Sequence, residues 1–107
     1  MPKDIHILLI EDDPYARDLM TLLLNRDWRT RVSGEAGSEA EATRILSNAS
    51  NKIGAVLVDT EVPGDPDWPF RLAALVRQTF PEAVFLGTGT RAQQEIESYS
   101  ERLAADY

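Results

Sequence analysis

Acidic side chains stand at two places in the sequence where an apolar run stops. The run at residues 5–10 is followed at once by Glu11, Asp12 and Asp13, and the run at residues 53–58 is followed by Asp59. Carboxylates suit hard cations such as Mg²⁺. With one histidine and no cysteine, the chain has no ligand set for zinc or copper, no disulfide and no thiolate nucleophile. The candidate chemistry is therefore that of carboxylates with magnesium.

These acids would repel one another if the fold brought them together. Two unit charges ~4 Å apart repel by about 4 kcal/mol at an effective dielectric constant of 20, so an unneutralised cluster would resist folding or stay partly protonated. A magnesium ion relieves the repulsion and leaves room for phosphate oxygens. Asp13 alone is better explained as a helix cap. We interpret the other three acids, Glu11, Asp12 and Asp59, as one functional set.

The apolar pattern predicts elements that would place this set at one edge of a sheet. Strands are predicted at residues 5–10, about 31–36, 53–58 and 83 to about 87. Helices are predicted from residue 14 to residue 25 or 26, after the capping box at residues 38–41, between residue 70 and Pro81, and from about Arg91. Strand and helix alternate four times, which predicts an α/β fold, a three-layer doubly wound parallel sheet. Such sheets bind ligands at the carboxyl ends of their strands.

Length and charge limit the classes of protein. The 107 residues, 43% of them hydrophobic, predict one domain over residues 1–107. No apolar run approaches the ~20 residues of a membrane span, and no signal-peptide pattern opens the chain, so we expect a cytoplasmic protein without membrane contact. A net charge of -7 with scattered basic residues argues against direct binding of nucleic acid.

Four segments resemble the receiver domains of two-component response regulators. They are the sequences Ile-Leu-Leu-Ile-Glu-Asp-Asp-Pro at residues 7–14, Val-Leu-Val-Asp at residues 56–59, Val-Pro-Gly at residues 62–64 and Phe-Leu-Gly-Thr-Gly at residues 85–89. The resemblance covers essentially the whole chain, in order and at suitable spacing. It implies a flavodoxin-like, CheY-like sheet of order 2-1-3-4, which a fifth strand would extend.

The resemblance also implies roles for individual residues. Asp59 would be the phosphoacceptor, receiving a phosphoryl group from a sensor histidine kinase or a phosphotransfer protein. Asp12, Asp59 and the backbone carbonyl of Glu61 would bind Mg²⁺, while Glu11 would hold a coordinated water. Thr88 would contact the phosphoryl group and report its arrival by switching a protein interface. Such a module is a signalling phosphoacceptor and not an enzyme with a separate substrate.

The end of the chain departs from the family's pattern. Receivers continue with a fifth strand that carries a phosphate-binding lysine and with a fifth helix, whereas this sequence stops at Tyr107 and has no lysine after Lys52. The chain is then either a fragment of a longer regulator or a degenerate receiver. A sheet that ends at the fourth strand has an open edge and a partly uncovered face. We therefore expect a chain that a partner completes, as a homodimer or through an output domain, or one that is marginally stable alone.

Three alternatives remain open at this stage. A pseudo-receiver would use the fold for dimerisation or docking without phosphorylation, and the missing lysine favours it. A phosphatase of the haloacid-dehalogenase type would require a second aspartate where the chain has Glu61. The loop at residues 65–69 looks longer than in receivers, and it is either a stiffened loop or a docking surface built on Trp68.

Overall fold

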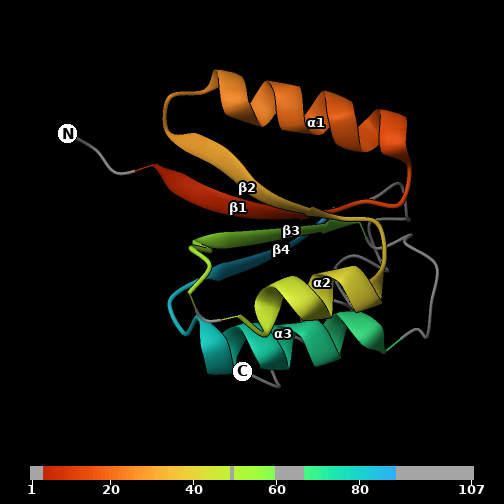
Figure 1. Ribbon diagram of the computed structural model, residues 1–107, viewed down its shortest axis with the longest axis vertical. Coiled ribbons are helices and arrows are strands. Elements are labelled where there is room, and N and C mark those ends of the chain that lie inside the picture. Colours follow the sequence, from red (N-terminus) through yellow and green to blue (C-terminus); the bar gives the residue numbers. More distant parts are fainter. Residues whose placement is uncertain (1–3, 49, 60–66, 89–107) are drawn as a thin grey trace.

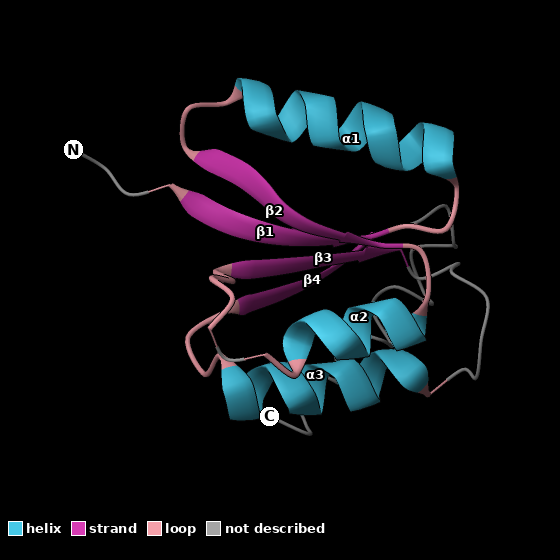
Figure 2. Cartoon of the chain, in the orientation of Figure 1, coloured by secondary structure: helices cyan, strands magenta, loops and turns pink. Residues whose placement is uncertain are grey.

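The structure is a computed structural model, and it describes residues 4–48, 50–59 and 67–88. Strands and helices alternate along the chain (Figures 1 and 2) in the order β1 (Ile5–Ile10), α1 (Pro14–Arg26), β2 (Thr30–Ala36), α2 (Glu39–Leu46), β3 (Ala55–Asp59), α3 (Trp68–Thr79) and β4 (Val84–Thr88). The helix predicted from about Arg91 lies outside the described residues. Among the described helices, none has the length and apolar character that a membrane crossing requires.

The four strands form one parallel sheet in the order β2-β1-β3-β4. Helix α1 lies on one face of this sheet, and α2 and α3 lie on the other (Figure 2). The predicted α/β class and the predicted strand order are therefore confirmed. In a parallel sheet all carboxyl ends share one edge, so the residues that follow β1 and β3 are brought to the same place.

Capping residues fix where the helices begin. Asp13 accepts a hydrogen bond at 2.9 Å from the backbone N–H of Tyr15, and Pro14 occupies the first turn of α1. Ser38 accepts one at 3.2 Å from the N–H of Glu41 at the start of α2. Both caps were expected from the sequence, because short polar side chains before an apolar-periodic run are typical N-caps.

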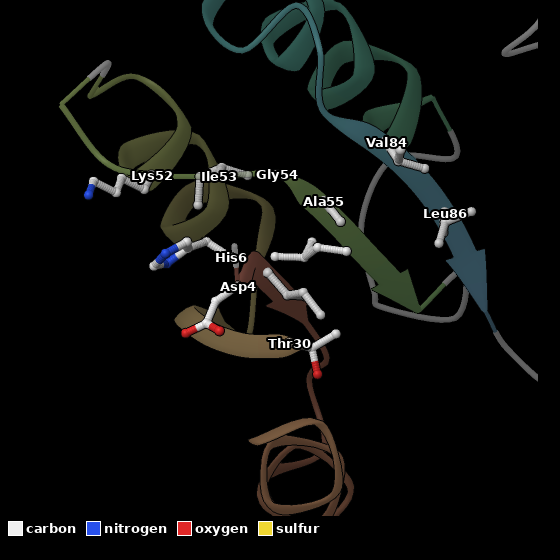
Figure 3. A pocket seen from close by; sticks show the side chains of 11 residues that line it. Asp4, His6, Thr30, Lys52, Ile53, Gly54, Ala55, Val84 and Leu86 are labelled. Carbon is white, nitrogen blue, oxygen red and sulfur yellow. The ribbon is translucent and has the colours of Figure 1, made fainter. Parts of the chain in front are cut away.

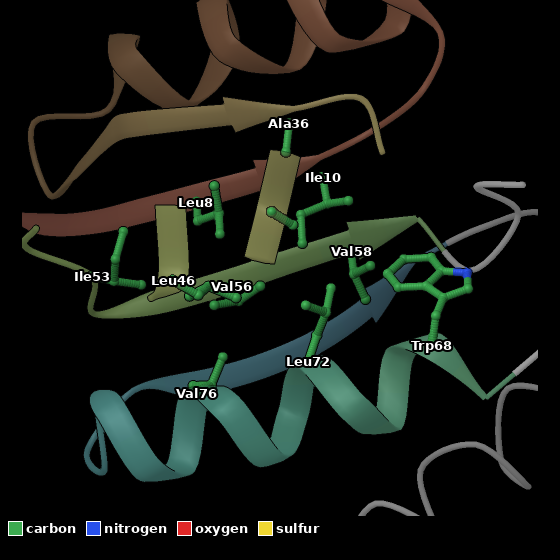
Figure 4. Close-up of a cluster of buried hydrophobic side chains, with 11 residues drawn as sticks. Leu8, Ile10, Ala36, Leu46, Ile53, Val56, Val58, Trp68, Leu72 and Val76 are labelled. Atoms are coloured by element: carbon green, nitrogen blue, oxygen red, sulfur yellow. The ribbon is translucent and has the colours of Figure 1, made fainter. Parts of the chain in front are cut away.

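The main core lies between the sheet and the helices α2 and α3 (Figure 4). The side chains that form it are almost fully buried and come from β1, β2, β3, α2, α3 and the segment before β3: Leu8, Ile10, Ala36, Ala42, Leu46, Ile53, Val56, Val58, Trp68, Leu72 and Val76. On β1 the core residues alternate with Ile7 and Leu9, which face the α1 side and are also buried. Strand β1 is thus covered on both faces, as its continuous apolar sequence predicts.

Trp68 belongs to this core and is not a docking surface. Helix α3 begins at Trp68, so Trp68 and Pro69 form its first turn and do not extend the preceding loop. Only 2% of the Trp68 surface is exposed, and its ring lies against the end of the sheet (Figure 4). The interpretation of Trp68 as an exposed docking residue is wrong. Pro69 is compatible with the first turn of the helix. The indole of Trp68 has a large apolar surface, and burying it stabilises the fold.

The α1 side of the sheet is covered much less completely. Helix α1 packs chiefly on β2 and β1, and none of its residues is fully buried. On β4, which is the edge strand of the described sheet, Val84 and Leu86 remain 53% and 51% exposed. Over β4, this face is therefore open in the described part of the chain, and the expected incompleteness of the whole sheet stays a prediction.

The two tryptophans provide a matched test of this division between core and surface. Trp68→Ala should lower the free energy of unfolding by about 3–5 kcal/mol, because it leaves a large cavity against the sheet. Trp28 is 67% exposed and has the guanidinium of Arg29 5.9 Å from its ring centroid, so Trp28→Ala should cost less than about 1 kcal/mol. Urea unfolding followed by circular dichroism measures both, and equal losses would contradict the placement of Trp68 in the core.

Candidate functional site

Three carboxyl groups meet at the carboxyl edge of the sheet. Glu11, Asp12 and Asp59 each offer an oxygen, and these oxygens lie within 4.8 Å of one another. Strands β1 and β3 are hydrogen-bonded neighbours with Ile10 opposite Val58, so the residues that come next in the two strands are also neighbours. The structure thus brings together the three acids that the sequence analysis grouped.

The three acids differ in their exposure to solvent. Glu11 is only 6% exposed and is the charged residue that the described chain buries, whereas Asp12 is exposed and Asp59 is half-buried. The backbone N–H of Glu11 donates to the carbonyl of Ala36 at 2.9 Å, which extends the pairing of β1 with β2 by one residue. Glu11 is therefore held at the base of the cluster, and Asp12 and Asp59 form its accessible rim.

The protonation of Glu11 reflects this arrangement. Burial, followed by a hydrogen bond and charge repulsion from Asp59, raises the pKa of Glu11 from 4.5 to about 7, against a smaller opposing effect of a hydrogen bond from the backbone of Asp13. A hydrogen bond between two carboxyl groups requires a shared proton. Without a cation, Glu11 thus keeps its proton up to about pH 7, and its neutral form removes the charge repulsion with Asp59.

Arg17 supports the site from α1, and the sequence analysis did not identify it. One guanidinium nitrogen donates to the backbone carbonyl of Glu11 at 2.9 Å, and Nε lies 4.0 Å from the carboxylate of Glu35. A side chain at Gly37 would come within 2.9 Å of the same guanidinium, so the small residue there leaves room for Arg17. Arg17 lies one helical turn after the cap at Asp13, and its backbone N–H donates to the carbonyl of Asp13. This position is the sequence signal that could have identified Arg17.

The remaining predicted site residues are described only in part or not at all. Thr88 is the last residue of β4, and its backbone lies opposite Asp59 in the strand register. This places its main chain beside the cluster, and its role stays a prediction. Glu61, whose carbonyl was expected to bind the metal, lies outside the described residues.

The donor set fits a hard divalent cation. All three side chains offer oxygen atoms, and no soft ligand is nearby in the sequence. An ion that neutralises the cluster would displace the proton that the buried Glu11 retains. The half-buried Asp59 remains reachable from solvent at the rim. The arrangement can therefore hold a metal ion and present one carboxylate to a phosphate compound beside it.

Comparison with solved structures gives the same fold. The isolated receiver domain of RcsB from Salmonella enterica serovar Typhimurium, solved with the phosphomimetic BeF₃⁻, matches with a TM-score of 0.75 and 16% identity over 95% of this chain and 73% of that chain. The non-phosphorylated HemR receiver domain from Leptospira biflexa matches with a TM-score of 0.67 and 24% identity over 91% and 75%. No protein-family model and no curated protein sequence matches the chain.

At these identities the comparisons show the fold, which is that of response-regulator receiver domains. The chain spans about three quarters of the two isolated receiver domains. RcsB in its complex with DNA also matches, with a TM-score of 0.76 and 17% identity over 94% of this chain. The chain spans 50% of that longer protein. The four described strands have the receiver order, so the resemblance inferred from sequence motifs is confirmed at the level of the fold.

The raised pKa of Glu11 predicts an unusual dependence of stability on pH. In the folded protein the pKa of Glu11 is about 7, above the ordinary 4.5, so the folded state binds the proton more tightly than the unfolded state does. Protonation of Glu11 therefore stabilises the fold. This stabilisation is complete below about pH 4.5 and is lost as the pH rises through 7. Glu11→Gln keeps the neutral form at every pH. In the metal-free protein it should therefore be more stable than the wild type at pH 8, by up to about 3 kcal/mol, and similar to it near pH 4.

Urea unfolding in the presence of a chelator at several pH values measures this difference. The exposed residue Glu82, in the turn before β4, provides the matched control, since Glu82→Gln should follow the wild-type pH profile. A profile of Glu11→Gln that runs parallel to that of the wild type would contradict the shared proton.

Proposed function

We propose that this chain is the phosphoacceptor module of a two-component response regulator and that Asp59 receives the phosphoryl group. The observation that carries the proposal is the meeting of Glu11, Asp12 and Asp59 within 4.8 Å at the carboxyl edge of a sheet with the receiver fold. The donors would be proteins that carry phosphohistidine, namely a sensor histidine kinase or a phosphotransfer protein. This implies a cytoplasmic location.

Magnesium is the cation that we assign to the cluster. The carboxylates of Asp12 and Asp59 would bind it directly, with the backbone carbonyl of Glu61 as a third protein ligand and Glu11 holding a coordinated water. When bound, Mg²⁺ supplies the charge neutralisation that lets a carboxylate approach a phosphoryl group. The all-oxygen donor set and the excess negative charge at the site support this choice.

The transfer itself needs little from the protein beyond position and charge. A carboxylate oxygen of Asp59 forms a bond to phosphorus as the bond between phosphorus and the histidine nitrogen of the donor breaks, and the electron pair of that bond stays with the departing imidazole. Glu11 and Arg17 hold the backbone and the base of the cluster in place. Thr88, whose backbone lies opposite Asp59, would donate its hydroxyl hydrogen to a phosphoryl oxygen.

The product is a signal and not a released metabolite, so we class the chain as a non-enzymatic phosphoacceptor with at most self-catalysed transfer and hydrolysis. Its net charge of -7 opposes direct contact with nucleic acid. The RcsB structures with DNA concern that longer protein, and any comparable output here would belong to another domain or chain.

The second candidate is a pseudo-receiver that docks without phosphorylation. The complete acidic cluster argues against it, because a docking module has no need to hold three mutually repelling carboxyl groups together.

Incubation with Mg²⁺ and acetyl phosphate separates the two candidates. We expect the intact mass to increase by one phosphoryl group, and we expect no increase in Asp59→Asn, because the amide is not a nucleophile. Asp18 on the exposed side of α1 provides the matched control, and Asp18→Asn should be phosphorylated like the wild type. An unmodified wild type, or modification that survives Asp59→Asn, would favour the pseudo-receiver.

Thermal melting tests the metal assignment separately. Binding to the folded state alone stabilises by RT ln(1 + [L]/Kd), so Mg²⁺ at about 100 times its Kd should add about 2.7 kcal/mol and raise the melting temperature at pH 8. Asp12→Asn removes a direct ligand and should abolish most of this rise, whereas Asp18→Asn should keep it. Equal rises in all three proteins would mean that the magnesium ion binds elsewhere.

A further inference from the structure

The pairing of β1 with β2 stops just beyond Glu11, at the base of the acidic cluster. The backbone N–H of Glu11 donates to the carbonyl of Ala36. In a parallel ladder the carbonyl of Glu11 would then accept a hydrogen bond from the N–H of residue 38. Ser38 instead is the N-cap of α2, which lies on the face of the sheet opposite α1. The carbonyl of Glu11 therefore lies where its usual partner strand ends.

Arg17 supplies the donor that β2 does not. A guanidinium nitrogen donates to the carbonyl of Glu11 at 2.9 Å, and the side chain of Arg17 is only 25% exposed. A hydrogen bond from a charged donor is stronger than the bond from a backbone N–H that it replaces. A side chain of α1 thus completes the pairing at the end of β1.

Other contacts hold α1 along β2, so that Arg17 reaches this carbonyl. Nε of Arg17 lies 4.0 Å from a carboxylate oxygen of Glu35 on β2, and the hydroxyl of Thr21 donates to the same oxygen at 2.8 Å. Near the end of the helix, the side chain of Asn25 accepts a hydrogen bond at 2.8 Å from the N–H of Val32. These contacts orient the guanidinium from the side and fix the helix that carries it.

Gly37 leaves the space that the guanidinium occupies. A Cβ atom at Gly37 would lie 2.9 Å from a guanidinium nitrogen of Arg17 and 3.8 Å from the carbonyl oxygen of Glu11. The φ angle of Gly37 is not in the left-handed region, so its own backbone does not exclude a side chain. A single methyl group at this position would therefore displace the end of Arg17 without straining the strand.

The bond from Arg17 fixes the peptide that joins Glu11 to Asp12. This peptide is planar and trans, so the carbonyl of Glu11 and the N–H of Asp12 point in opposite directions. The carbonyl lies beside Gly37 on the β2 side, and β1 lies between β2 and β3 in the sheet. The N–H of Asp12 is thus directed toward β3, the strand that ends at Asp59.

We propose that Arg17 is a positioning residue for the magnesium site and that Gly37 is a second one, because it leaves room for Arg17. The inference rests on the proposed function, since the metal ligand that Arg17 positions is Asp12. Arg17 acts through the peptide between Glu11 and Asp12, which sets how the chain leaves β1. Contacts that orient metal ligands typically change metal affinity about 10- to 100-fold.

Isothermal titration with Mg²⁺ at pH 8 tests the role of Arg17. Arg17→Ala should raise the Kd of Mg²⁺ about 10-fold or more, and Arg17→Lys, which keeps the charge and a donor, should recover part of this loss. Arg26 is exposed at the other end of α1, and Arg26→Ala should bind Mg²⁺ like the wild type. An unchanged Kd in Arg17→Ala, an equal increase in Arg26→Ala, or no recovery in Arg17→Lys would overturn the proposal.

A double-mutant cycle tests the geometry without removing the guanidinium. Gly37→Ala alone should weaken Mg²⁺ binding about as much as Arg17→Ala, but it should add little to Arg17→Ala, because the two changes remove the same contact. Gly54 provides the control, since it lines an open cavity of about 590 Å³ at the amino end of β3, where a methyl group would come no closer than 3.4 Å to its neighbours (Figure 3). Gly54→Ala should leave the Kd unchanged. Additive losses from Gly37→Ala and Arg17→Ala would overturn the proposal.

These results can be told apart from a failure of the proposed function. A wild type that binds Mg²⁺ but accepts no phosphoryl group would overturn the phosphoacceptor role, while the Kd values of the variants would still decide whether Arg17 positions the site. A wild type that binds no Mg²⁺ would overturn the metal assignment and this inference with it.

Discussion

The parallel pairing of β1 with β3 is the constraint on which the site depends. It sets Ile10 beside Val58 and thereby forces the acids that follow the two strands into one place. Leu8, Ile10, Val56 and Val58 are at most 1% exposed, and burying such a side chain contributes roughly 1.5–3 kcal/mol. Four of them outweigh the repulsion of one pair of close carboxylates, about 4 kcal/mol at an effective dielectric constant of 20. The apolar sheet can therefore hold charges together that would separate in an unfolded chain.

The strained cluster has two ways to reduce its repulsion. In the absence of a cation, Glu11 retains a proton and hydrogen-bonds to Asp59. A divalent cation at the cluster would supply positive charge in place of the proton and would favour the ionised form of Glu11. Arg17 further restricts the conformation of the backbone at the site, because its guanidinium donates a hydrogen bond to the carbonyl of Glu11 at 2.9 Å. The backbone is thus arranged before any ligand arrives, which is the property that phosphoryl transfer by positioning requires.

Much of the fold could be predicted from the sequence, because its strongest signals are local. The apolar runs, the cap at Asp13 and the cap at Ser38 predicted the element order and the starts of α1 and α2 correctly. The grouping of three acids followed from parallel topology alone. The first turn of α3 was missed because a segment rich in proline resembles a loop, although proline is also a common first helical residue.

Other features depend on how separate elements pack against one another, which local spacing does not determine. The hydrogen bond of Arg17 to the carbonyl of Glu11 requires the chain to turn back from α1 over the end of β1. The apolar spacing within residues 14–26 correctly predicted a helix, but spacing shows only which residues share a side and not whether anything covers that side. Leu19 and Leu23 prove to be half-exposed because α1 is tied toward β2 by Thr21 and Asn25.

The site reaches the α1 side of the sheet through strand β4. The backbone of its last residue, Thr88, lies opposite Asp59, and Leu86 two positions earlier is 51% exposed on that side. Two residues of a strand span about 7 Å, so a shift of the backbone at Thr88 reaches Leu86 through a single stiff element. If the arrival of a phosphoryl group favours one position of β4, any contact that Leu86 makes in only one of these positions must in turn favour or oppose phosphorylation by the same free energy.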